Sequence, residues 1–161
     1  MTDLAISEQH HRRFRRAFPR ALASDVTAAA SVMSATNNEH HRTFAVWVDG
    51  EELLVPYRIY HAEPDPDAIT KLAPRAQLVL RCLYTRHHDG HTRQRSLEQV
   101  VIAPDPWVAP YVVQLIGEYV VEIIEVVAAA LPELTVPGSL QSALYGRFAA
   151  DNPAFIDLTE I

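Results

Sequence analysis

Residues 87–91 hold the densest group of chemically active side chains in this chain, three histidines and one aspartate around a glycine. Imidazole and carboxylate groups bind zinc and other divalent transition metals. A metal-dependent enzyme is therefore one interpretation, with these side chains and two glutamates from a later helix as ligands: His87, His88, Asp89, His91, Glu118 and Glu122. Adjacent histidines on a helix point about 100° apart, and no HExxH or spaced Cys/His motif is present. We favour a structural interpretation, in which His87 completes an apolar face, His88 is solvated and Asp89 caps the next helix.

A second candidate site is basic. Four arginines crowd the first expected helix, residues 7–18, beside two phenylalanines: Arg12, Arg13, Arg15 and Arg16, with Phe14 and Phe18. Guanidinium groups bind phosphates and acidic protein surfaces, so nucleic-acid binding through this helix is an alternative function. The formal net charge of −6 disfavours it. We favour a helix whose phenylalanines dock on the core and whose arginines pair with Glu118, Glu122 or Glu125, of the same chain or of a second subunit. Arg93 and Arg95 are the remaining candidate binding residues, because they can neutralise the same glutamates.

Composition narrows the function classes further. The 161 residues are 48% hydrophobic and 21% charged, which is enough apolar material for a buried core. The one cysteine, Cys82, excludes a disulfide framework, and no glycine-rich phosphate loop is present. The N-terminal residues lack an apolar signal segment, and glutamates interrupt the apolar run over residues 107–131. We therefore expect a cytoplasmic protein with no membrane partner.

Residues 43–60 predict a β-hairpin. Two β-rich runs flank Asp49 and Gly50, a dipeptide that accepts the positive φ angles of a type I′ turn. That turn would pair Val46 with Leu53. The opposite face of the hairpin is apolar as well, so we expect the hairpin to pack on helices; the residues of that face are Ala45, Trp47 and Leu54.

Most of the remaining chain predicts helices. We expect a single α+β domain of mostly α character, with an N-terminal helical arm (1–42), the hairpin (43–60), a helical core (68–151) and a tail (152–161) that is a docked strand or a loose end. The core would surround one long helix over residues 106–130. Its polar residues form one narrow stripe: Tyr111, Gln114, Glu118, Glu122, Glu125 and Ala129. A helix that is apolar over most of its circumference must be enclosed by neighbouring elements or by another subunit.

Two resemblances accompany these patterns. The stretch from PYRIY through RHHDGHTRQR to GEYVVEII resembles a family of uncharacterised bacterial proteins, which implies no particular activity. The string HDGHTRQRSLEQVV resembles the turn and second helix of a HEAT-type repeat, with Asp89, Arg93 and Leu97 at the characteristic positions. No second copy follows at a period near 40 residues, so one helical pair is indicated and a repeat array is not. The HEAT-like resemblance implies binding to other macromolecules.

The function predicted from these features is a non-catalytic protein-interaction module, either a homo-oligomer or a subunit of a larger assembly. It needs no cofactor. The metal-dependent enzyme, with zinc or another divalent transition metal, and nucleic-acid binding through the arginine-rich helix are the alternatives.

Overall fold

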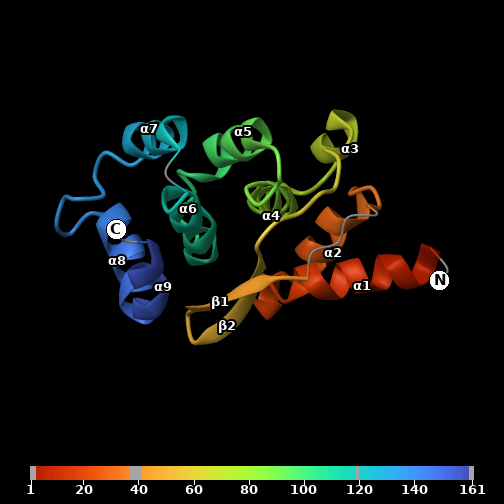
Figure 1. Ribbon diagram of the computed structural model, residues 1–161, viewed down its shortest axis with the longest axis horizontal. Coiled ribbons are helices and arrows are strands. Elements are labelled where there is room, and N and C mark those ends of the chain that lie inside the picture. The colour runs from red at the N-terminus through yellow and green to blue at the C-terminus, as the bar shows by residue number, and fades with distance from the viewer. Residues whose placement is uncertain (1–2, 37–40, 119, 160–161) are drawn as a thin grey trace.

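The computed structural model describes residues 3–36, 41–118 and 120–159, and Figure 1 shows a mostly helical α+β fold with one small antiparallel sheet. The strands are β1 (Thr43–Val48) and β2 (Glu51–Pro56). The α-helices are α1 (Asp3–Arg15), α2 (Ala23–Ser31), α3 (Pro66–Thr70), α4 (Pro74–Tyr84), α5 (Gly90–Val100), α6 (Ala109–Ile116), α7 (Val121–Ala130), α8 (Leu140–Asp151) and α9 (Pro153–Thr159). Two short 3-10 turns, Arg20–Leu22 and Pro106–Val108, precede α2 and α6.

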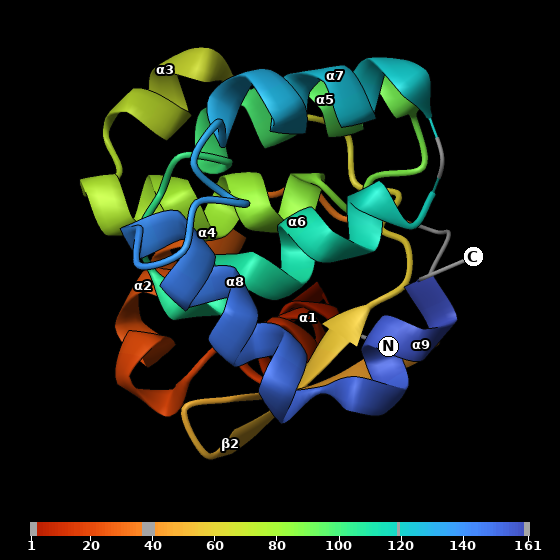
Figure 2. The same ribbon diagram turned by 90° about the vertical axis from the view of Figure 1, so that its left-hand side faces the viewer.

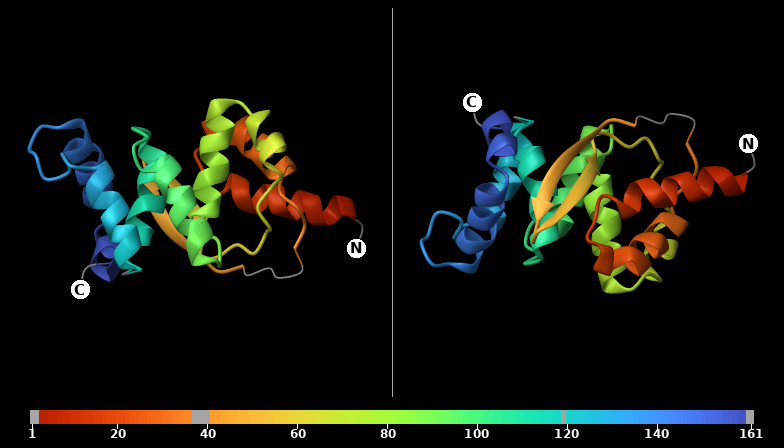
Figure 3. Two further views of the ribbon diagram at one scale, coloured as in Figure 1. Left: turned by 90° about the horizontal axis from the view of Figure 1, so that it is seen from above. Right: turned by 90° about the horizontal axis from the view of Figure 1, so that it is seen from below.

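The elements form a row along the longest axis of the molecule. In Figure 1, α1 and α2 lie at one end, α4 and the hairpin in the middle, and α8 and α9 at the other end, so the chain termini are far apart. Helix α4 packs against both α2 and α5, and α7 packs on α5 and α6. Seen from above and below, the hairpin lies between the N-terminal helices and the C-terminal pair (Figure 3).

The hairpin has the predicted turn and register. Asp49 and Gly50 have φ angles of 50° and 79°, and Val46 pairs with Leu53. The face that carries Val46 and Leu53 is buried in the core. The opposite face is only partly covered, because Trp47 remains 49% exposed. The hairpin packs on helices as expected, with α8 against β1.

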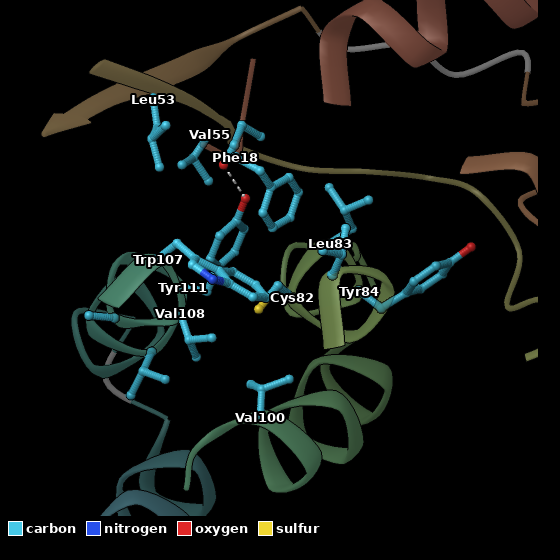
Figure 4. Close-up of a cluster of buried hydrophobic side chains, with 14 of the residues drawn as sticks. Phe18, Leu53, Val55, Cys82, Leu83, Tyr84, Val100, Trp107, Val108 and Tyr111 are labelled. Atoms are coloured by element: carbon cyan, nitrogen blue, oxygen red, sulfur yellow. Dashed lines mark hydrogen bonds between the residues drawn. The ribbon is translucent and has the colours of Figure 1, made fainter. Parts of the chain in front are cut away.

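Tyr111 lies at the centre of the core. Its side chain is fully buried, stacks on Phe18 and donates a hydrogen bond from its hydroxyl to the carbonyl of Ala17 at 2.9 Å. Figure 4 shows side chains from the hairpin, from α4 and from the segment before α6 converging on this ring. Full burial of a side chain of this size contributes roughly 1.5–3 kcal/mol. The prediction that Tyr111 belongs to a polar stripe is wrong.

The prediction of one continuous long helix over residues 106–130 is wrong. The segment is a 3-10 turn followed by two α-helices, with a break after Ile116 at Gly117 and Glu118 and an extended Val120 before α7. Glycine is a poor helix former, and the Glu118 carboxylate is held by arginines outside the helix. The break lets α7 turn back onto α5, so α6 is enclosed while α7 lies at the surface. No helix within the described residues is both long and apolar enough to cross a bilayer.

The C-terminal segment differs from the expectation as well. Residues 153–159 form helix α9 and not a strand or a loose end, and Phe155 stacks on Phe44 of the hairpin at 5.3 Å between ring centroids. On α8, Leu140 is 86% exposed, whereas Phe148 is buried. The tail is helical because Phe155 finds an apolar contact that its local sequence does not reveal.

Candidate functional site

The principal polar cluster in the described structure is three arginines around one glutamate. Arg58 follows β2, Arg86 follows α4, Arg93 lies in α5, and Glu118 lies in the break after α6. Glu118 Oε1 accepts hydrogen bonds from Arg58 Nη1 at 2.9 Å and Arg86 Nη2 at 3.0 Å, and its Oε2 lies 3.3 Å from Arg93 Nε. One carboxylate thus joins four segments of the chain. We call these four residues the arginine cluster.

Arg86 is the most deeply buried member of the arginine cluster, with no exposed surface. Its guanidinium also donates to the backbone carbonyls of Pro56, Tyr57 and Thr85. Burial is the largest influence on this group and lowers the pKa of Arg86 to about 10, with Glu118 opposing the shift and the charges of Arg58 and Arg93 adding to it. A buried guanidinium with this many hydrogen-bond partners fixes the relative positions of the chain segments that it binds.

The histidine segment forms a capped turn. His87 is buried, its Nε2 donates to the carbonyl of His61 at 2.9 Å, and its Nδ1 accepts from the backbone N–H of Asp89 at 3.1 Å. Both ring nitrogens of His87 are therefore occupied by protein. His88 is exposed, and Asp89 caps α5 through the N–H of Thr92 at 2.9 Å. These positions agree with the structural interpretation of the segment.

The six candidate metal ligands are not brought together. Glu118 faces the arginines, and Glu122 is exposed on α7. Among the described residues, no group of three or more His, Cys, Asp or Glu side chains is placed to hold a metal ion. We do not carry the metal-dependent enzyme forward as a proposal.

Within the described part of this chain, the N-terminal arginines do not pair with Glu118, Glu122 or Glu125, and pairing with a second subunit stays a prediction. Arg13 Nη2 donates to the carbonyl of Arg58 at 3.2 Å, Arg15 Nε to the carbonyl of His11 at 3.2 Å, and Arg12 and Arg16 are exposed. Phe14 and Phe18 are buried in the core, as predicted. Of the other two candidates, Arg93 does reach Glu118, whereas Arg95 pairs with Glu63. The Arg13 contact thus links the arginine-rich helix to the backbone of Arg58 in the arginine cluster.

A second candidate site is the outer face of α7. Val121 is 64% exposed and Ile124 is 40% exposed, and the exposed Ala128 continues this row at helical spacing. Glu122 and Glu125 are exposed beside it. We call these five residues the α7 face. Figure 2 shows α7 along one edge of the molecule, with α5 behind it.

Exposed apolar groups are concentrated in the C-terminal half. Of the seven large hydrophobic residues that are exposed in the described structure, six follow residue 100: Ile102, Val121, Ile124, Val136, Leu140 and Leu158. The seventh, Trp47, lines a pocket of about 210 Å³ between the hairpin turn and α8, together with Leu144, Phe148 and Pro106. This pocket is smaller than the roughly 300–1,000 Å³ of most ligand sites.

Comparison of the chain with protein-family models, curated proteins and solved structures found no match. The resemblances to an uncharacterised bacterial family and to a HEAT-type helical pair stay predictions. The α4–α5 pair packs together around the Asp89 turn, as a helical pair would.

Sequence reasoning missed Arg58 and Arg86 as members of the arginine cluster. A signal for Arg86 was present: it lies three residues after Leu83 and seven after Val79, in line with the apolar face of α4. An arginine on such a face must find an acidic partner inside the fold. Arg58 carried no comparable signal, because it follows a proline in an irregular segment.

Proposed function

We propose that this chain is a non-catalytic protein-interaction module and that its partner binds the α7 face. The observation that carries the proposal is the exposure of Val121 and Ile124 on a helix whose buried side is also apolar. Monomeric proteins rarely expose contiguous apolar patches larger than a few hundred Å², and apolar patches rimmed by polar residues mark sites of association. Burial of these side chains in a complex would release the same hydrophobic free energy that burial in a core does.

The charges around the α7 face indicate the chemistry of the partner. Glu122 and Glu125 flank the apolar row, and residues 98–161 carry nine acidic residues and one arginine. A second copy that docked the same face against itself would bring like charges together, which is unfavourable at an interface. The partner that complements this surface is a protein segment with aliphatic or aromatic side chains and flanking arginine or lysine residues.

Selection of a random peptide library against the full chain tests this proposal directly. We expect the selected peptides to combine apolar residues with arginine or lysine. A double variant, Val121→Ser with Ile124→Ser, should weaken their binding at least tenfold. Both residues are exposed, so circular dichroism should show an unchanged fold. Leu158→Ser is the matched control, because Leu158 is 85% exposed on α9, away from α7 (Figure 2).

Three results would overturn the proposal: selected peptides that bind the double variant as well as the natural chain, peptides that are predominantly acidic, or equal losses with Leu158→Ser. Light scattering supplies an independent readout. We expect a monomer in the absence of a partner. If the natural chain is a dimer and the double variant is a monomer, a second copy of this chain binds the α7 face. That result would overturn the proposal of a basic partner.

A further inference from the structure

The arginine cluster carries more positive charge than it neutralises. Its three guanidinium groups meet a single carboxylate, so the four side chains have a formal surplus of two positive charges. The exposed fractions of the side chains are 0% for Arg86, 13% for Arg93 and 13% for Glu118, whereas Arg58 is 31% exposed. Charges removed from water in this way are normally paired within the protein.

The neighbouring carboxylates are engaged elsewhere. Asp89 is exposed and its side chain caps α5 through the backbone N–H of Thr92. Glu63 accepts from Thr92 and pairs with Arg95. Within the described residues, therefore, Glu118 is the one carboxylate in ion-pair contact with these arginines.

Donors remain available at the exposed edge of the cluster. Arg58 uses Nη1 for Glu118 and for the carbonyl of Tyr57, which leaves its Nε and Nη2 without a hydrogen bond to the described residues. Arg93 donates from Nη1 to the carbonyls of His87 and His88, and its Nη2 makes no hydrogen bond to the described residues. The two guanidiniums contact opposite oxygens of one carboxylate, so they are close enough for a single tetrahedral anion to bridge them.

We propose that Arg58 and Arg93 form a binding site for one dianionic phosphate group, with Arg86 and Glu118 as the buried base that positions them. A phosphate monoester carries about −1.5 to −2 charges at neutral pH, which matches the surplus of the cluster. Planar guanidinium groups bind phosphate oxygens through paired hydrogen bonds. The site takes one phosphate group and not a nucleic-acid backbone, since the chain as a whole has a net charge of −6.

Titration with inorganic phosphate tests the site in the full chain. Binding is measured by calorimetry and by thermal unfolding, with sodium chloride at the same ionic strength as the reference. We expect saturable binding and a rise in Tm that chloride does not produce. Phosphate also stabilises proteins in general by its exclusion from their surfaces, so the comparison with variants decides the result.

Two variants change the charge balance in opposite directions. Arg58→Gln should weaken phosphate binding at least tenfold, whereas Glu118→Gln, which raises the surplus, should strengthen it. Arg20→Gln is the matched control, since Arg20 is 96% exposed and pairs with Glu51 elsewhere on the surface. If Glu118→Gln does not fold, Arg58→Gln against Arg20→Gln still decides the question. Equal binding by Arg58→Gln and the natural chain, or no difference between phosphate and chloride, would overturn the proposal.

Methyl phosphate and dimethyl phosphate complete the test. Tighter binding of methyl phosphate than of inorganic phosphate identifies an esterified ligand as the source, and the reverse order identifies the free ion. Dimethyl phosphate carries only one negative charge. Binding of dimethyl phosphate as tight as that of the dianions would overturn the inferred charge match.

Discussion

Arg86 and Glu118 are 32 residues apart in the chain, and their side chains meet at 3.0 Å inside the molecule. The contact joins the end of α4 to the end of α6, and the same arginine holds the chain that leaves β2 through the carbonyls of Pro56 and Tyr57. This buried guanidinium therefore helps to hold the hairpin exit against the helices, together with the backbone bridge between Ile59 and His87. Without Arg86, Glu118 keeps its contacts with Arg58 and Arg93. The backbone carbonyls that Arg86 binds lose a buried donor.

Replacement of Arg86 should accordingly be among the most destabilising single changes in the protein. We expect Arg86→Met to lower the free energy of unfolding by about 3–5 kcal/mol, because three backbone carbonyls lose their donor, at about 1–3 kcal/mol for each buried group left unsatisfied. Urea denaturation followed by circular dichroism measures the loss. Arg75→Gln is the control: its pair with Asp25 lies at the surface, where such pairs contribute about 0–1 kcal/mol. Similar losses in the two variants would contradict the assigned role of Arg86.

Asn152 holds the edge of β1 in place. Its Oδ1 accepts from the N–H of Trp47 at 2.6 Å, and its Nδ2 donates to the carbonyls of Trp47 at 2.8 Å and Phe148 at 2.9 Å. The side chain thus substitutes for a residue of a third strand. We expect Asn152→Leu to lower the free energy of unfolding by about 1–3 kcal/mol, the cost of leaving buried polar groups unsatisfied.

Asn152→Asp distinguishes the acceptor role of the Asn152 side chain from its donor role. It keeps the acceptor for the Trp47 N–H and removes the donors to both carbonyls, so we expect a loss as well. The fluorescence of Trp47, measured in a Trp107→Phe background, should change in both Asn152 variants. An unchanged spectrum and an unchanged midpoint of unfolding would show that Asn152 does not hold the strand.

The sequence was sufficient where local chemistry decides the structure. The Asp49–Gly50 turn fixed the hairpin register, and Asp89 caps α5 at the expected position. Each of these features depends on backbone conformation or on a hydrogen bond between residues close in the chain. The mostly helical α+β class followed from the same local patterns.

The sequence was insufficient where distant residues decide the structure. Apolar residues run almost continuously from Trp107 to Leu131, and nothing local shows that Glu118 is drawn to arginines from three other segments. The break between α6 and α7 therefore escaped prediction, and so did the α7 face that the break exposes. The helical tail was missed for the same reason, since Phe155 packs on Phe44, more than 100 residues away.

Two glycines should respond in opposite ways to replacement by alanine. Gly50 has a φ of +79° in the hairpin turn, where a side chain is strained even though the space is open. We expect Gly50→Ala to lower the free energy of unfolding by about 1 kcal/mol. Gly146 lies inside α8 with nothing near its added Cβ, so Gly146→Ala should raise it by about 0.5–1 kcal/mol. The urea midpoint of Gly50→Ala should fall and that of Gly146→Ala should rise. A shift of both midpoints in the same direction would contradict the turn conformation of Gly50 or the helical position of Gly146.

The stability of the protein should fall as the pH drops through the range in which histidine titrates. Burial, with a smaller contribution from His88, lowers the pKa of His87 below its ordinary value of 6.5. The unfolded chain therefore takes up a proton near pH 6.5 that folded His87 resists, because its Nδ1 already accepts from the N–H of Asp89. This contribution is fully present above about pH 7.5 and is lost at lower pH, by at most about 1.4 kcal/mol per pH unit. Urea midpoints between pH 7.5 and 5.5 measure the slope, which His87→Gln should reduce and His91→Gln, at an exposed histidine, should leave in place. A slope that persists in His87→Gln would assign the pH dependence to another group.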